Sequence, residues 1–228
     1  MPWGATFAGL AGSFVGIGLA RFAYTPLIPA LIAAGWFSPA QAVYLGAANL
    51  GGYLVGAFAA RPVATRVAPR LALRAAMVLA AVAFFACAQP LSFAWFFVWR
   101  ALAGAAGGIL MVVAAPTVLA IVPPGRRGLA GGAIFTGVGL GIAATGLLVP
   151  LLLRSGLTAT WLGLGTVSAA LTVAAWLFWP AAPHLSATSH RRTRFPAPVR
   201  AAVAIYGLDA VGVVPHMIFL VDFVARGL

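Results

Sequence analysis

The sequence predicts an all-α, polytopic membrane protein, and three observations lead to this prediction. Of the 228 residues, 63% are hydrophobic, whereas soluble domains average about 45–50%. Only 7% are charged, against about 25% in soluble domains. The apolar residues form long unbroken runs, which suit spanning helices of about 20 residues better than the short alternating strands of a membrane barrel. This composition excludes a water-soluble globular fold and a disordered chain.

Clusters of Arg, Pro and Gly divide the chain into seven predicted spans. In chain order they are Phe7–Leu31, Ala40–Ala60, Leu71–Ala88, Phe93–Val122, Leu129–Leu153, Thr160–Trp179 and Ala201–Val224. Several exceed the length needed to cross a bilayer, so we expect tilt or kinks, with Pro116 the natural kink of the fourth span.

The only long polar stretch separates the sixth predicted span from the seventh. It is rich in Pro, Ser, Thr, His and Arg, a composition typical of a linker. We therefore predict a six-helix bundle at 1–180, an Arg-rich linker at 181–199, and a seventh helix at 200–228 that begins an incomplete second bundle.

The basic residues predict the orientation of the chain, because short cytoplasmic loops accumulate Arg and Lys. Alternate predicted loops carry the Arg residues, namely Arg61, Arg66 and Arg70, then Arg126 and Arg127, then Arg191, Arg192, Arg194 and Arg200. The loops between them are almost without basic residues, so the N-terminus is expected to be cytoplasmic. These topology signals also account for 14 basic against 2 acidic residues, and nucleic-acid binding is not expected.

Three ionisable side chains lie where the bilayer disfavours them. Arg21 and Arg100 fall inside spans one and four, where an Arg costs about 2.5–3.5 kcal/mol at the bilayer centre. Each could line a wet transport path, snorkel to the interface, or pin two helices together. Asp209 lies near the middle of span seven, and it could be a counter-ion to Arg21, a proton carrier, or a plain helix–helix hydrogen bond.

Small and polar residues give a second signal. Gly pairs spaced by four let helix backbones approach closely, and they occur at Gly52 and Gly56, Gly104 and Gly108, and Gly137 and Gly141. Asn49 shares a helix face with Gly52, Tyr53 and Gly56, so it is expected either to hydrogen-bond across the bundle or to meet a solute. His216, one turn from the outer end of span seven, is expected to be structural.

Patterns typical of enzymes are missing from the sequence. Two acids in the whole chain provide no carboxylate pair for acid–base chemistry and no acidic cluster for Mg²⁺. The three His residues are split between the linker and span seven, and Cys87 is the single Cys, so no metal site or cofactor is expected.

Three stretches resemble the YbfB-type branch of the major facilitator superfamily. They are the run from Gly16 through Arg21 to Pro29, the run Tyr44–Gly56, and Tyr206-Gly-Leu at the start of span seven. In addition, Arg100 followed by Gly104 and Gly107 is similar to a span-four motif whose Arg is tied to proton coupling in some members. The resemblance implies a bacterial inner-membrane transporter of twelve spans, so a chain of seven spans looks like a partial sequence.

Two departures from the superfamily pattern stand out. Ala60 stands before Arg61 where the loop motif usually carries an Asp, which puts the usual gating salt bridge in doubt. Span five contains no Pro between Gly137 and Gly146, so the Gly-Pro pair associated with many antiporters is missing, and antiport is not supported.

A weak internal repeat relates spans one and seven, which such folds place as counterparts in two parallel halves. Gly18-Leu19 is followed by Pro26, and Gly207-Leu208 is followed by Pro215 at the same spacing. In this register Asp209 matches the neighbour of Arg21, which leads to the hypothesis that Arg21 and Asp209 approach each other at the centre of a cavity.

The sequence therefore predicts a secondary active transporter that moves a small organic solute by alternating access, with proton coupling left open. An anionic or polar solute is expected to meet Arg21, Tyr24, Asn49, Arg100 and Asp209. The alternative is a non-transporting scaffold or assembly subunit of the membrane. Solute and lipid bilayer are the expected partners.

Overall fold

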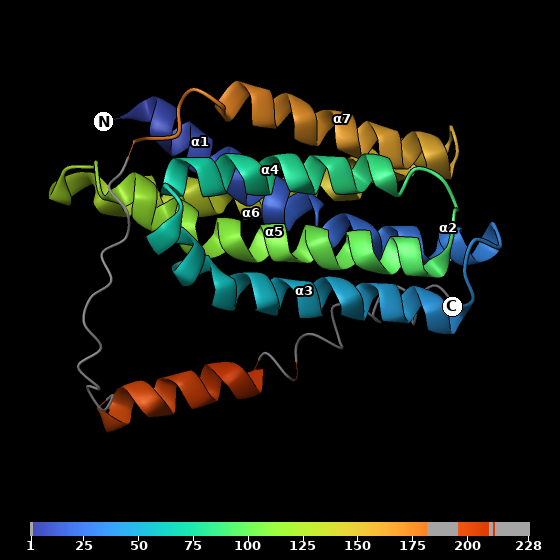
Figure 1. The fold of residues 1–228 in the computed structure, drawn as a ribbon, viewed down its shortest axis with the longest axis horizontal. Helices are drawn as coiled ribbons and strands as arrows, with labels where there is room; N and C mark the ends of the chain where they lie inside the picture. The colour runs from blue at the N-terminus through green and yellow to red at the C-terminus, as the bar shows by residue number, and fades with distance from the viewer. Residues whose placement is uncertain (1, 182–195, 210–211, 213–228) are drawn as a thin grey trace. The chain divides into compact units, whose positions relative to one another are not determined.

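The computed structural model describes residues 2–181, 196–209 and 212, and all of its regular structure in these ranges is helical (Figure 1). The chain divides into two compact units, Met1–Ser186 and Ala187–Leu228, which are described separately. The first unit contains six helical segments that are long and apolar enough to cross a membrane. This confirms the predicted all-α membrane bundle.

The six spans follow the predicted order, with ends shifted by a few residues. They are Trp3–Ala33, Pro39–Arg66, Pro69–Ala86, Phe93–Leu119, Pro124–Leu153 and Leu157–Ala175. The second span is α3 (Pro39–Arg66), and the remaining four contain α4 (Pro69–Ala86), α5 (Phe93–Leu119), α6 (Arg127–Leu153) and α7 (Leu157–Ala175). Helix α5 continues through Pro116.

The basic residues expected in the loop after the second span lie on helices instead. Helix α3 continues through Arg61 and Pro62 to Arg66, and α4 already includes Arg70. Arg is a good helix former, and a cation in the last turn of a helix is favoured by the helix dipole. Only residues 67–68 separate the two helices.

Side chains at two helix starts explain where these spans begin. The hydroxyl of Ser38 accepts a hydrogen bond from the Gln41 backbone N–H at 3.2 Å, while the Gln41 side chain accepts one from the Ser38 N–H at 3.0 Å. This capping box satisfies two N–H groups that a helix start leaves unpaired. Ser92 caps α5 in a similar way, accepting from the Trp95 N–H at 3.1 Å.

The first span is interrupted at its centre. It consists of α1 (Trp3–Ser13), the π-helical segment η1 (Phe14–Leu19), the 3₁₀ segment η2 (Phe22–Leu27) and α2 (Ile28–Ala33). The change from the wide π pattern to the narrow 3₁₀ pattern falls at residues 20–21. Such segments inside a helix often mark functional sites or hinges.

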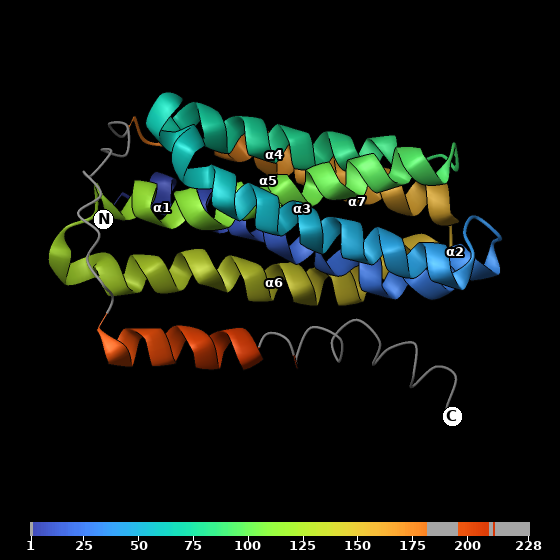
Figure 2. The same cartoon turned by 60° about the horizontal axis from the view of Figure 1, so that its bottom comes forward.

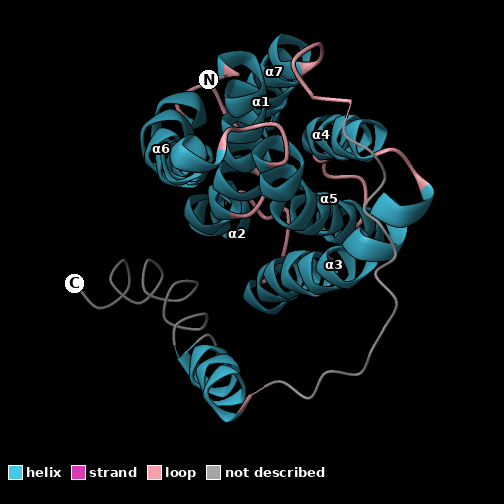
Figure 3. Cartoon of the chain, turned by 90° about the vertical axis from the view of Figure 1, so that its left-hand side faces the viewer, coloured by secondary structure: helices cyan, strands magenta, loops and turns pink. Residues whose placement is uncertain are grey.

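Glycine allows α3 and α5 to pack backbone to backbone, and these two helices share the most extensive contact in the unit (Figure 3). A Cβ added at Gly52 would collide with the Ala101 carbonyl, and one added at Gly104 would collide with the Asn49 carbonyl. Gly56 and Gly108 make equally close contacts one turn further along. The predicted role of these glycine pairs is confirmed.

Helix α6 is buried along one face and exposed along another. Gly137 meets the backbone of Leu10, and Gly141 meets Gly18, so α6 packs tightly against the first span. Its other face carries Gly132, Gly139 and Gly146, which have open space beside them. Figure 2 shows α6 running along one side of this unit.

The second unit is described only in part. Residues 197–209 form a helix that begins with hydrogen bonds from the N–H groups of Val199 and Arg200 to the Pro196 carbonyl, at 3.0 and 3.2 Å. Apart from Gly212, the remainder of predicted span seven, with His216 and Pro215, lies outside the described residues.

Candidate functional site

Three of the five predicted site residues lie together: Asn49 and Arg100 both donate to the backbone carbonyl of Ala20, and the Tyr24 ring packs against Arg100. Ala20 and Arg21 form the junction between η1 and η2 in the first span. Tyr24 lies in η2, Asn49 on α3, and Arg100 on α5. The interruption of the first span therefore sits where side chains from two other spans converge.

Arg100 is buried, with only 3% of its surface exposed. Its Nη1 donates a hydrogen bond to the Ala20 carbonyl at 3.2 Å, and its guanidinium carbon lies 4.4 Å from the centroid of the Tyr24 ring. Its Nε has no hydrogen-bond partner among the described residues. A backbone carbonyl and an aromatic face thus offset part of the desolvation of this cation.

Asn49 ties the same three spans together through its side-chain amide. The Nδ2 group donates to the Arg100 carbonyl at 3.0 Å and to the Ala20 carbonyl at 3.4 Å. Asn49 is 3% exposed, and a buried amide needs such partners because an unsatisfied donor costs about 1–3 kcal/mol. Of the two roles the sequence left open, the structure shows the hydrogen bond across the bundle.

Tyr24 anchors the segment that follows the junction. Its hydroxyl donates to the Ala42 carbonyl at 2.8 Å, which links η2 to the start of α3. The Tyr24 ring is 3% exposed and carries Arg100 on its face. Contact of Tyr24, Asn49 or Arg100 with a solute remains a prediction.

Arg21 has a different environment from Arg100. It is half-buried, and its guanidinium carbon lies 5.4 Å from the centroid of the Phe22 ring and 5.5 Å from that of the Tyr53 ring. No Asp or Glu precedes Asp209 in the chain. The first unit therefore offers aromatic faces to this cation and no carboxylate.

Asp209 lies on the second unit, at the end of the described helix 197–209, with an exposed side chain. The predicted approach of Arg21 and Asp209 joins the two units and stays a prediction. His216 lies outside the described residues.

Two contributors to the site were not predicted as site residues. Tyr53 shares the Asn49 face of its helix, and this spacing is the sequence signal for its approach to Arg21. The Ala20 carbonyl has no sequence signal, since every residue carries a backbone carbonyl. What singles it out is the change of helix type at this point.

An apolar groove near these helices does not contain the predicted residues. It has a volume of about 580 Å³ and lies between α3 and α5. Its lining includes Tyr44, Gly52, Phe97 and Ala101. None of the five predicted site residues lines it, so we do not assign the site to this groove.

Comparison with known proteins identifies the family of the chain. No curated protein matches the chain. The family model described as "Uncharacterised MFS-type transporter YbfB" matches residues 13–228, a range that includes the interruption of the first span and the converging side chains on α3 and α5. With six described spans and a match over nearly its whole length, the chain is a multi-pass membrane protein that belongs to the YbfB-type family of major facilitator superfamily transporters.

Proposed function

We propose that the protein is a secondary active transporter that moves a small organic solute across the bacterial inner membrane by alternating access. The observation that carries this proposal is the position of Arg21, a half-buried cation at an interruption of a membrane span. Intramembrane ionisable groups usually face a bundle interior or a wet cavity and mark a transport path. Interrupted spans form the midplane sites of many secondary transporters.

The charge of Arg21 favours an anionic or polar solute. The rings of Phe22 and Tyr53 stabilise a cation weakly at this exposure, by about 0.5–1 kcal/mol. A solute carboxylate would supply the missing negative charge and accept paired N–H groups from the guanidinium. We propose Asp209 as the residue that competes for Arg21 when no solute is bound, or that carries a proton during the cycle.

Arg100, Asn49 and Tyr24 are proposed to couple solute binding to movement of the first span. Asn49 and Arg100 bond the carbonyl of Ala20, directly beside Arg21, and the Tyr24 ring packs against Arg100. The Arg100 Nε is buried without a partner among the described residues, an arrangement that raises the energy of this state. A shift of the first span that exchanged these contacts would bring the same side chains toward the solute. A cytoplasmic N-terminus, as the Arg distribution predicts, completes the proposed topology.

Release of solutes from proteoliposomes tests the proposal while the substrate is still unidentified. Vesicles containing the protein are loaded with a water-soluble metabolite extract of bacterial cells, and mass spectrometry follows each solute that leaves. We expect selective loss of one or a few organic solutes. Arg21→Gln should abolish this loss, because the amide keeps the polarity of the side chain but removes the charge.

Arg154→Gln is the matched control, since Arg154 lies at the turn between α6 and α7 and is exposed. This variant should release the same solutes at the wild-type rate. Absence of selective release from wild-type vesicles would support a scaffold role. Unchanged release in Arg21→Gln would show that transport does not require the charge of Arg21.

A further inference from the structure

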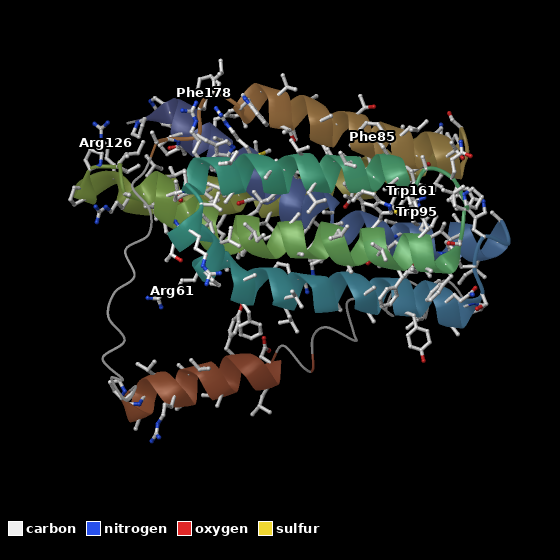
Figure 4. The ribbon with its side chains drawn as sticks, in the orientation of Figure 1. Arg61, Phe85, Trp95, Arg126, Trp161 and Phe178 are labelled. Carbon is white, nitrogen blue, oxygen red and sulfur yellow. The ribbon has the colours of Figure 1, made fainter. Side chains whose placement is uncertain are left out.

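One end of the first unit carries a concentration of positive charge, which we call the arginine pole. It contains the end of α3, the start of α4 and the start of α6, and its Arg residues are Arg61, Arg66, Arg70, Arg74, Arg126 and Arg127. Figure 4 shows Arg61 and Arg126 at this end, with Trp95 and Trp161 toward the opposite one. No Asp or Glu occurs before Asp209, so the first unit cannot neutralise its own pole.

Arg74 is held in a fixed position at this pole. Its Nε donates to the Trp176 carbonyl at 2.8 Å, its Nη2 donates to the same oxygen, and its guanidinium carbon lies 4.7 Å from the centroid of the Trp176 ring. Trp176 directly follows α7, where carbonyls lack partners and the helix dipole favours a cation. The guanidinium is thus already ordered, and it retains further N–H donors.

Arg70 adds a second cation on the same face of α4, one turn earlier. Its Nε is buried and has no hydrogen-bond partner among the described residues. The N-cap, Ala68, provides no side-chain hydrogen bond, and the start of a helix carries partial positive charge. Two neighbouring cations and an uncapped helix start repel one another unless an anion lies between them or beside them.

Exposed apolar side chains that flank Arg70 and Trp176 in the sequence indicate an amphipathic ligand. Leu71 is 58% exposed, Leu177 is 78% exposed and Phe178 is 49% exposed. Exposed apolar groups of this size at the end of a span suit the edge of the hydrocarbon layer, with Trp at the level of the headgroups. A free anion or a nucleic acid would leave this apolar surface uncovered.

We propose that Arg70 and Arg74, with the end of α7 at Trp176, form a binding site for the phosphate of an anionic phospholipid of the phosphatidylglycerol type. The guanidinium groups donate to the phosphate oxygens, since Arg matches this geometry with paired N–H groups. The acyl chains lie against Leu71, Leu177 and Phe178. The site is separate from Arg21 and does not depend on the solute.

Thermal unfolding of the purified full chain in detergent tests the site. The single Cys87 is buried, so reaction with a thiol-reactive dye reports unfolding. We expect phosphatidylglycerol to raise the unfolding midpoint by about 3–5 °C relative to the same mole fraction of phosphatidylcholine. The double variant Arg70→Gln/Arg74→Gln should lose most of this difference, whereas Arg154→Gln, at the opposite pole, should keep it.

Two further measurements, a phosphate control and fluorescence quenching by brominated lipids, identify the ligand. Inorganic phosphate at matched concentration should produce no shift, and an equal shift would overturn the lipid assignment. If the double variant does not fold, wild-type protein still decides, because brominated phosphatidylglycerol at low mole fraction should quench tryptophan fluorescence more than brominated phosphatidylcholine, through Trp176 at the site. That preference should weaken with salt. Equal quenching, or equal loss of the shift in Arg154→Gln, would overturn the proposal.

Discussion

Arg21 and Arg100 each place a cation inside a membrane span, which is unfavourable, and the protein surrounds the two cations differently. Arg100 is enclosed, with the Ala20 carbonyl and the Tyr24 ring as its partners. Arg21, one residue beyond Ala20, is half-buried between the rings of Phe22 and Tyr53. A cation inside a span is therefore not by itself a sign of a solute path. The enclosed one donates a hydrogen bond to the first span, and the half-buried one keeps part of its surface exposed.

Variants that separate α3 from α5 should remove the difference in burial between Arg100 and Arg21. We expect them to cause the largest loss of stability. Gly104→Leu places a branched side chain against the Asn49 carbonyl, and we expect it to lower the free energy of unfolding by more than about 4 kcal/mol. Thermal unfolding with dye labelling of Cys87 measures the loss. Gly139→Leu is the control, since Gly139 has open space around it, and its effect should stay within about 0.5 kcal/mol. Equal effects of both variants would show that the close contact does not set the stability.

Asn49→Ala should have the next largest effect. It removes the hydrogen bonds to the carbonyls of Ala20 and Arg100, and we expect a loss of about 2 kcal/mol in the free energy of unfolding. The double-mutant cycle sharpens the comparison between the two arginines. Asn49 and Arg100 donate to the same oxygen, so Asn49→Ala and Arg100→Met should couple by at least about 0.5 kcal/mol.

The effects of Asn49→Ala and Arg21→Gln on the free energy of unfolding should be additive within about 0.5 kcal/mol, because Arg21 is not a partner of the Asn49 amide in these hydrogen bonds. Strong coupling of Asn49 to Arg21 and none to Arg100 would reverse the roles assigned to the two cations.

Arg100→Met should change the stability only slightly but abolish transport. Burial of a charge is costly, and its replacement by an apolar side chain of similar length is often neutral or stabilising. We expect a change within about 1 kcal/mol in the free energy of unfolding, together with loss of solute release from proteoliposomes. Retained release would show that the charge of Arg100 serves packing alone.

The sequence predicted the six spans of the first unit well, because runs of about 20 apolar residues have few alternatives to a helix in a membrane. It also predicted a close backbone approach at Gly52 and Gly56, since only small residues permit it, but it did not indicate that α5 is the helix they meet. It placed Arg61 and Arg66 in a loop, whereas both lie on α3. Charge indicates proximity to the membrane surface, but it does not end a helix.

The environments of the two arginines could not be predicted from their sequence positions. Insertion scales assign Arg21 and Arg100 similar unfavourable energies, but the difference between them arises from the Ala20 carbonyl and from two aromatic rings on other segments. The interrupted hydrogen-bond pattern of the first span has only an indirect signal, the glycines before Arg21 and the prolines after it. The other features of these environments depend on contacts between residues far apart in the sequence, and helical periodicity does not predict such contacts.

The smallest expected effect concerns the ring of Tyr53, which tests the half-buried arginine directly. Tyr53→Leu removes an aromatic face 5.5 Å from the Arg21 guanidinium, and such a contact contributes about 0.5–1 kcal/mol at this exposure. We expect the rate of solute release at low solute concentration to fall about two- to five-fold. Tyr53→Phe keeps the ring and should retain most of the rate. Tyr44→Leu removes an exposed tyrosine of the same helix that lines the groove between α3 and α5, and it should leave the rate unchanged. If Tyr53→Phe loses as much activity as Tyr53→Leu, the hydroxyl and not the aromatic face supports Arg21. Arg21 and Arg100 would then differ both in burial and in whether an aromatic face stabilises the cation.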